Sequence, residues 1–180
     1  MPRLVSNYRV PSTRLTEALL IKPIPLMGFL IALFVLVLDQ ASKWFLQAVI
    51  NLPTVGQVVV LPFFKFTYVS NTGVSFGIFS GGGLGARIVL SLFALVISAV
   101  VGSWLLKADR KWPAIAYGLV IGGALGNVID RAIYGQVFDF IDFSGLGFPW
   151  IFNIADSAIT VGVAMLAWDM FFANRSAAPQ

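Results

Sequence analysis

One run of the chain, residues 88–106, carries no charged side chain, and this leaves few folds open. A helix of about 20 apolar residues is long enough to cross the hydrocarbon core of a bilayer. Hydrophobic residues make up 58% of the sequence and charged residues 11%, whereas soluble domains are roughly a quarter charged. Three further apolar runs occur at 24–50, 112–129 and 150–172. The sequence therefore predicts an all-α membrane protein with four transmembrane helices.

The basic residues flank the apolar runs and predict how these cross the membrane. Arg3, Arg9, Arg14 and Lys22 precede the first run, and a basic turn at 107–111 follows the second. Because two crossings separate these groups, the positive-inside rule places both in the cytoplasm. The prediction is a cytoplasmic basic tail at 1–22, a single membrane domain at 23–173 and a cytoplasmic tail at 174–180. Both termini are then inside, and the loops at 51–85 and 134–150 face outward.

The first outward loop has its own pattern. Residues 58–69 are rich in Val, Phe, Thr and Tyr and are interrupted by Pro62, which predicts one or two short strands. We expect these strands to form a small β-rich platform outside the membrane. Glycines at 81–83 favour a flexible outer loop at 70–85 that opens and closes as a lid.

Three glycines recur at every fourth position of the third run. Gly118, Gly122 and Gly126 share one helix face, a small-xxx-small pattern that allows a second helix to approach closely. We interpret these glycines as packing residues.

The side chains available exclude several kinds of chemistry. The chain contains no Cys and no His, which excludes thiol catalysis, histidine-based triads and most zinc sites. Its net charge is +4, but no basic face with interleaved aromatic residues predicts binding to nucleic acid. We therefore predict no metal, no cofactor and no nucleic-acid partner. Any catalysis has to use carboxylates, hydroxyls, lysines or amides.

Four of the eight acidic residues fall between 127 and 157, namely Asp130, Asp139, Asp142 and Asp156. Carboxylates are costly beside a bilayer, so this concentration indicates a functional site. Two closely spaced carboxyls that share one proton are the arrangement of an aspartic protease. Position alone does not tell which two pair. Asp130 precedes Arg131, which suggests charge compensation; Asp142 also fits a solvated loop acid; Asp139 and Asp156 flank the loop and could meet at its base.

Several of these polar residues also fit structural roles. Asn153 and Asp156 suit the start of a helix, where Asn and Asp are favoured as caps. Asn127 suits a hydrogen bond between helices, and Arg131 suits an interfacial anchor. Two other functions stay open: a proton-coupled transporter, which usually has its ionisable site near the midplane, and a non-catalytic scaffold.

Five segments resemble those of the bacterial lipoprotein signal peptidases, also called signal peptidase II, in the same order and with similar spacing. They are DQASK (39–43), NTGVSFG (71–77), GGALGNVIDR (122–131), VFDFIDF (137–143) and FNIADSAI (152–159). The resemblance implies an aspartic endopeptidase of the inner membrane, with its site on the periplasmic side. It also implies removal of signal peptides from diacylglyceryl-modified prolipoproteins, just before the lipid-modified cysteine. Membrane lipids, a monomeric state and inhibition by globomycin are implied as well.

The same resemblance implies roles for single residues. Asp139 and Asp156 match the catalytic dyad. Asp39 and Lys43 match a supporting interaction at the end of the first helix, and Asp130 matches a position with structural or substrate contacts. The remaining matches line the site and hold the substrate or orient the dyad: Asn71 with its neighbour Gly73, Asn127, Arg131 and Asn153.

Overall fold

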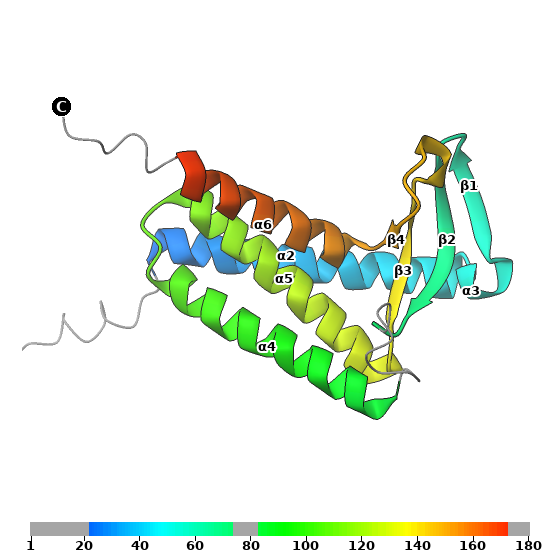
Figure 1. The fold of residues 1–180 in the computed structure, drawn as a ribbon, viewed down its shortest axis with the longest axis horizontal. Helices are drawn as coiled ribbons and strands as arrows, with labels where there is room; N and C mark the ends of the chain where they lie inside the picture. The colour runs from blue at the N-terminus through cyan, green and yellow to red at the C-terminus, as the bar shows by residue number, and fades with distance from the viewer. Residues whose placement is uncertain (1–21, 74–82, 173–180) are drawn as a thin grey trace, which may run out of the picture.

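Four long helices form a bundle, and a small sheet stands across one end of it (Figure 1). The computed structural model describes residues 22–73 and 83–172. Nearly all of the two predicted tails and most of the predicted lid lie outside these residues. The elements are α2 (Pro23–Trp44) with the π-helical turn η1 (Phe45–Val49), α3 (Leu52–Val55), β1 (Gln57–Leu61), β2 (Phe64–Asn71), α4 (Leu84–Leu106), α5 (Lys111–Tyr134), β3 (Val137–Asp142), η2 (Ser144–Leu146), β4 (Ile151–Phe152) and α6 (Ile154–Phe172).

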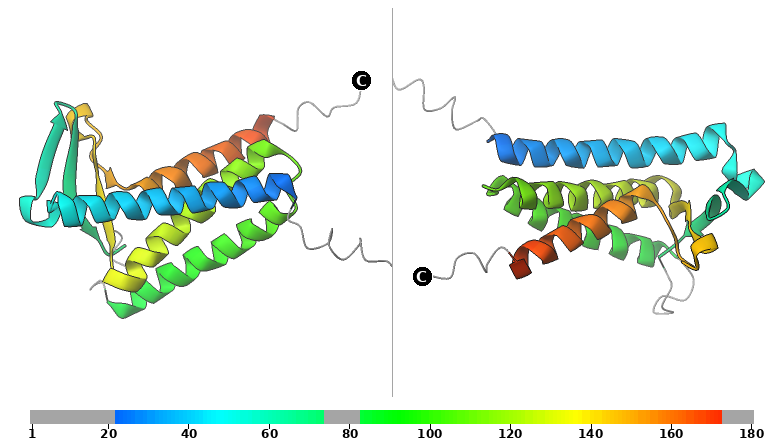
Figure 2. Two further views of the ribbon diagram at one scale, coloured as in Figure 1. Left: turned by 180° about the vertical axis from the view of Figure 1, so that it is seen from behind. Right: turned by 90° about the horizontal axis from the view of Figure 1, so that it is seen from above.

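The prediction of four membrane-spanning helices is confirmed. The spans Pro23–Val49, Leu84–Leu106, Lys111–Tyr134 and Ile154–Phe172 are each long and apolar enough to cross a bilayer. The ends of α2 and α6 that point away from the sheet lie near the α4–α5 turn (Figures 1 and 2). The four helices thus run between two common ends, with the sheet at one of them.

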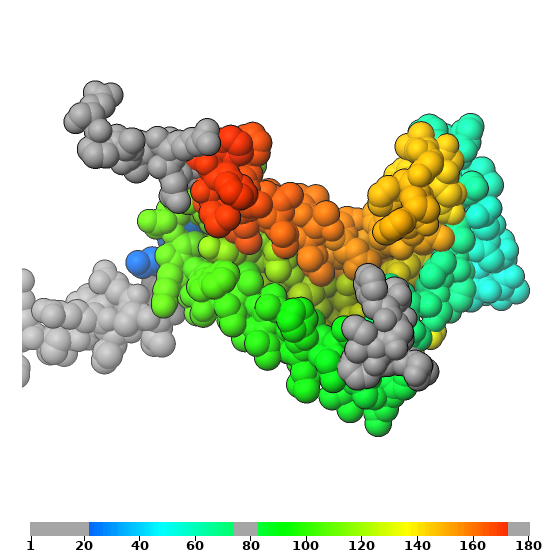
Figure 3. Space-filling view, in the orientation of Figure 1, coloured from blue at the N-terminus to red at the C-terminus, as the bar shows by residue number. Residues whose placement is uncertain are grey.

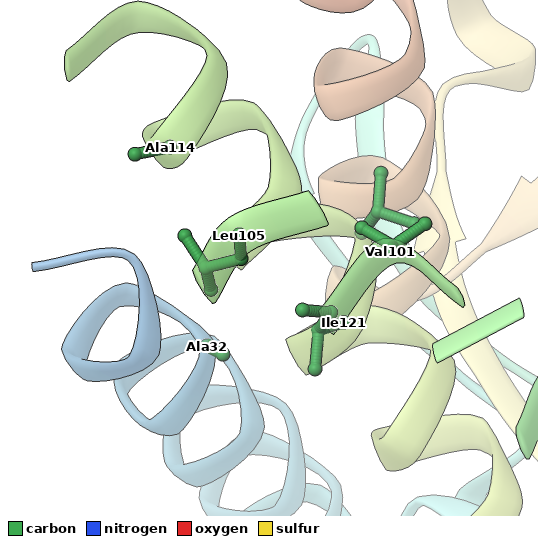
Figure 4. Close-up of a cluster of buried hydrophobic side chains, with 6 residues drawn as sticks. Ala32, Val101, Leu105, Ala114 and Ile121 are labelled. Carbon is green, nitrogen blue, oxygen red and sulfur yellow. The ribbon is translucent and has the colours of Figure 1, made fainter. Parts of the chain in front are cut away.

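The most buried of the four helices is α5, which packs against α2, α4 and α6 (Figure 2). A cluster of buried side chains from α2, α4 and α5 includes Ala32, Val101, Leu105 and Ile121 (Figure 4). Outside this core, α2, α4 and α6 expose large apolar side chains such as Phe93, which suits surfaces that face lipid.

The prediction that the glycines of α5 allow close helix contact is confirmed. A Cβ atom added at Gly122 would lie 2.5 Å from the carbonyl oxygen of Ala32, and one at Gly118 would meet the carbonyl oxygen of Gly28. Both contacts are with the backbone of α2. The third glycine, Gly126, instead faces the Asp39 carboxylate, where an added Cβ would lie 2.7 Å from Oδ2.

Replacing Gly122 with Ala is expected to destabilise the folded protein by about 1–3 kcal/mol, because α2 has to move away from α5. The measurement is the unfolding midpoint in detergent. Gly102→Ala is the matched control, since a Cβ added there would meet no other described part of the protein within 4 Å, apart from the neighbouring backbone of its own helix. Equal midpoints for the two variants would contradict this account of the packing.

The two predicted strands, β1 and β2, belong to a larger antiparallel sheet of order β1-β2-β3-β4. The loop predicted at 134–150 contributes β3, which was missed. The predicted start of the fourth helix, at Trp150, is wrong: α6 begins at Ile154, because Ile151 and Phe152 pair with Asp142 and Ile141 of β3.

Candidate active site

The register of the sheet brings Asn71 to Asp139. Asn71 of β2 pairs with Val137 of β3, and Val69 pairs with Asp139, so the Asn71 and Asp139 side chains project from the same face. The Nδ2 of Asn71 donates a hydrogen bond of 2.8 Å to Oδ2 of Asp139. Asp139 is only 1% exposed, so this bond lies away from bulk water.

Gly73 holds the Asn71 amide in place. Its N–H donates to Oδ1 of Asn71 at 2.8 Å, which leaves the Nδ2 of Asn71 directed at Asp139. Gly73 has φ of +78°, and an added Cβ would meet the side chain of Leu90. Both the backbone conformation and the lack of space therefore favour glycine.

Asn153 connects the two carboxylates that the resemblance assigns to the dyad. As the N-cap of α6, its Oδ1 accepts the N–H of Asp156 at 2.8 Å, while Oδ2 of Asp156 accepts the N–H of Asn153 at 3.3 Å. This is a capping box, so the capping interpretation is confirmed. The Nδ2 of Asn153 also donates to Oδ1 of Asp139 at 2.7 Å. The same side chain thus serves both the helix and the site.

Asn127 joins α5 to α6 at the same place. Its Nδ2 donates to Oδ1 of Asp156 at 2.7 Å, and its Oδ1 accepts a bond of 3.3 Å from Asn153. The prediction of a hydrogen bond between helices is confirmed. Both oxygens of Asp156 and both oxygens of Asp139 accept hydrogen bonds from side-chain amides or the backbone.

The surroundings of Asp139 favour its protonated form. Burial, and next the negative charge of Asp156, raise its pKa from 3.8 to about 6. The hydrogen bonds from Asn71 and Asn153 and the charge of Lys43 act in the opposite direction. The Asp156 carboxylate therefore lies close enough to act on the Asp139 carboxyl, as two carboxyls that share a proton must.

Arg131 lies where an apolar groove meets this cluster. The groove has a volume of about 240 Å³ and is lined by α4, α5 and α6, with Leu90, Phe93 and Ile159 among its residues. Figure 3 shows α5 at the bottom of the channel between α4 and α6. Arg131 and Asn127 line its polar end. Within the described part of the chain, the buried Nε of Arg131 has no hydrogen-bond partner.

A second polar cluster lies beside the first and is almost fully buried. Lys43 Nζ lies 2.7 Å from Oδ2 of Asp39 and 2.7 Å from Oδ2 of Asp130. The sequence suggested that Arg131 compensates the charge of Asp130. Asp130 instead forms its ion pair with Lys43 of α2. Lys43 is four residues from Asp39 and so reaches it along the helix, whereas only the tertiary fold brings Asp130 to it.

Gln40 also belongs to this second cluster, and we did not predict it. Its Nε2 lies 3.1 Å from Oδ2 of Asp39 and 2.9 Å from Oδ1 of Asp130. Two signals in the sequence could have found it: its place beside Asp39 near the end of an otherwise apolar helix, and its position within the matched segment DQASK (39–43).

Asp142 does not join either cluster, and it is not a solvated loop acid, since it is 3% exposed. Its Oδ2 accepts a bond of 2.6 Å from Thr67 of β2, and its Oδ1 accepts the N–H of Ser144. The bond from Thr67 is the main reason why its pKa lies below the ordinary value. Asp142 thus holds the turn after β3 to the neighbouring strand.

Comparisons of the sequence with known proteins identify its family. A sequence model of the family described as signal peptidase (SPase) II matches residues 31–172. A lipoprotein signal peptidase of Caulobacter vibrioides is 40% identical over 151 residues, which are 83% of this chain and 89% of that protein. One of Pseudomonas aeruginosa strain PAO1 is 45% identical over 151 residues, covering 81% and 88% of the two chains.

Solved structures share the fold. A bacterial membrane enzyme determined by the in meso method at 2.3 Å resolution has a TM-score of 0.73 and 30% identity, covering 86% of this chain and 93% of its own. A second bacterial membrane enzyme, determined at 1.9 Å, has a TM-score of 0.70 and 32% identity.

Proposed function

The chain belongs to the signal peptidase II family, and on that premise we propose that it removes signal peptides from diacylglyceryl-modified prolipoproteins as an aspartic endopeptidase. The cut falls just before the lipid-modified cysteine. The observation that carries the proposal is the shared environment of Asp139 and Asp156, which Asn153 contacts on both sides. Two interacting carboxyls, one with a raised pKa, are what an aspartic dyad requires.

The chemistry follows from one proton held by the pair. The ionised carboxyl takes a proton from water as the water oxygen attacks the scissile carbonyl carbon. The protonated carboxyl gives its proton to the carbonyl oxygen, which forms a tetrahedral diol. When the C–N bond breaks, the carboxyl that took the proton from water gives it to the cysteine nitrogen, and a diol hydroxyl returns a proton to the other carboxyl. The signal peptide leaves as a carboxylic acid that then ionises, and the pair again holds one proton. Asn71, Asn127 and Asn153 hold the two carboxyls in place throughout.

The apolar groove suits the part of the substrate that lies in the bilayer. It runs between α4, α5 and α6 to Asn127 and Arg131, beside the dyad. The Nε of Arg131, which has no partner among residues 22–73 and 83–172, is a donor for a carbonyl oxygen of the substrate backbone. A substrate anchored by its lipid would approach from this side.

We further propose that the enzyme lies in the inner membrane with the sheet and the dyad on the periplasmic side. Lys22, Lys107, Arg110 and Lys111 lie at the ends of the spans far from the sheet, which supports a cytoplasmic position for that end. Both termini are then cytoplasmic, and residues 23–173 form one domain. The position of the carboxylates at one end of the bundle disfavours a transporter.

The experiment uses purified protein in detergent with one precursor in two forms, with and without the diacylglyceryl group on its cysteine. Mass spectrometry of both products is expected to show a cut directly before the cysteine, in the lipid-modified form only. No cleavage, or a cut elsewhere in the precursor, would contradict the proposed function.

Removing the Asn71 amide is expected to move the alkaline limb of the pH–rate profile to higher pH. The bond from Asn71 stabilises the ionised form of Asp139 and lowers its pKa, so Asn71→Ala raises that pKa above about 6. The pair then keeps its shared proton to higher pH. The measurement is kcat/KM against pH, with the exposed neighbour Ser70→Ala as control. A limb that stays in place, or moves to lower pH, would show that Asn71 does not act on this proton.

A further inference from the structure

Each carboxylate of the second cluster is bonded to the backbone next to one member of the dyad. Oδ1 of Asp39 accepts the N–H of Ala155 at 3.0 Å, and Ala155 directly precedes Asp156. Oδ2 of Asp130 accepts the N–H of Phe138 at 3.4 Å, and Phe138 directly precedes Asp139. Asp39 therefore anchors the first turn of α6, and Asp130 anchors β3.

Two side chains of α2 tie these two anchors together. Lys43 Nζ lies 2.7 Å from Oδ2 of each carboxylate. The Nε2 of Gln40 makes a second connection, at 3.1 Å to Asp39 and 2.9 Å to Asp130. A continuous path of contacts thus runs from Asp156 through its own helix to Asp39, across α2, and through Asp130 to Asp139.

We propose that Lys43 and Gln40 are positioning residues that set the separation of Asp139 and Asp156 by tying Asp39 to Asp130. The inference rests on the proposed function, because that separation matters only if the two carboxyls work as a pair. A misplacement of catalytic groups by about 1 Å costs about 100-fold in rate. The reaction therefore requires a fixed separation between β3 and α6.

A glycine of α5 leaves space for the contacts of Lys43 and Gln40 with Asp39 and Asp130. Gly126 faces Asp39, and an added Cβ would lie 2.7 Å from Oδ2 of Asp39, so α5 can approach only with glycine there. A buried ion pair is often no more stabilising than well-packed apolar residues. The ion pair here fixes the positions of Asp39 and Asp130 relative to each other, because both carboxylates contact the Nζ of Lys43, which is 2% exposed.

The test separates the connection between the anchors from the anchors themselves. In Asp39→Asn/Lys43→Met/Asp130→Asn, both Asn side chains can still accept the backbone N–H groups, but the charged connection is gone. No unpaired charge remains, so the unfolding midpoint is expected near that of the wild type. We expect kcat to fall about 100-fold and KM to change less than about twofold.

The second variant, Gln40→Met, removes one connection and leaves no buried charge unpaired. We expect its kcat to fall about tenfold at unchanged KM. A tenfold loss corresponds to half the increase in activation free energy of a 100-fold loss, as expected when one of two connections is removed. The matched control is Arg110→Met/Asp169→Asn, which removes the ion pair between the α4–α5 turn and α6 far from the site. Its kcat is expected to equal that of the wild type.

The pH profile separates a change of position from general loosening of the fold, because loosening would expose Asp139 to water and lower its raised pKa. The charged groups that act on Asp139 are Asp156 of α6, Lys43 of α2 and Arg131 of α5. The triple variant removes the positive charge of Lys43 together with the negative charges of Asp39 and Asp130, which act on the Asp139 carboxylate in opposite directions, so Gln40→Met, which removes no charge, is the variant to compare with the wild type. Gln40→Met is expected to leave the limb where it is.

The outcomes distinguish this inference from the proposed function. If the wild type does not cleave, the proposed function is wrong, and the inference falls with it. If the wild type cleaves and the folded triple variant keeps its kcat, only the inference is wrong. If the triple variant does not fold, Gln40→Met decides, and a wild-type kcat there overturns the inference.

Discussion

Asp139→Asn and Asp156→Asn are each expected to lower the rate of signal-peptide cleavage by about 10⁴-fold, the upper end of what acid–base catalysis contributes. Asn keeps the size of the side chain, and its Oδ1 can still accept a bond from Asn153 at position 139 or from Asn127 at position 156. It cannot release or take up the shared proton. The measurement is single-turnover cleavage of the lipid-modified precursor.

The matched control is Asp142→Asn, which replaces the other buried acid of β3, the strand that carries Asp139. Asp142 bonds Thr67 and the backbone of Ser144 and touches neither dyad carboxylate. Cleavage is expected to stay within a few-fold of the wild type. If Asp142→Asn loses as much activity as the other two, the losses reflect damage to the sheet. If both dyad variants cleave normally, Asp139 and Asp156 are not catalytic, and the alternative of a non-catalytic scaffold is favoured.

Lys43→Met on its own is expected to destabilise the protein by about 3–5 kcal/mol, the second large effect. The substitution leaves the Asp39 and Asp130 carboxylates buried without the cation that lies 2.7 Å from each. Removing one partner of a buried ion pair costs about this much, because the other charge is left uncompensated. The measurement is unfolding in detergent, followed by circular dichroism.

The control for that experiment is Lys107→Met, which removes an exposed lysine at the far end of α4. Its effect on the free energy of unfolding is expected to be within about 0.5 kcal/mol. Together with the neutral triple variant, it separates the cost of unpaired buried charge from that of losing a lysine. A Lys43→Met protein as stable as the wild type would show that the two carboxylates become solvated or protonated without cost.

The features that could be predicted from the sequence are those with a local period. Apolar runs of spanning length predicted the four helices, and glycines at every fourth position predicted close approach of another helix to α5, which the structure identifies as α2. The strand β3 was missed because its residues are almost all buried, so the alternation of apolar and polar residues that marks a half-exposed strand is absent. The start of α6 was placed too early, although the spacing of Asn153 and Asp156 is that of a capping box.

Which carboxylates pair could not be predicted from position alone, because the answer depends on contacts between distant segments. The pairing of Asn71 with Val137 puts an amide beside Asp139, and nothing in either strand specifies that register. In the same way, Asp39 and Lys43 could be recognised as helix neighbours, whereas the contact of Lys43 with Asp130 requires α5 to pack on α2. The assignment of Asp139 and Asp156 as the dyad came from the family resemblance, and the contacts between distant segments give physical support for that assignment.

The pKa of the Asp139 carboxyl tests most directly whether Asp139 and Asp156 form one pair. It can be measured by NMR titration of ¹³C-labelled aspartate in the wild type and in Asp156→Asn, with Asp139→Asn to assign the signal. For a paired Asp139 we expect a pKa of about 6 in the wild type. In Asp156→Asn the pKa falls, because the neighbouring negative charge is gone, but it stays above the ordinary value, because Asp139 is still buried. An ordinary pKa in the wild type, or the same pKa in both proteins, would contradict the pairing of Asp139 with Asp156.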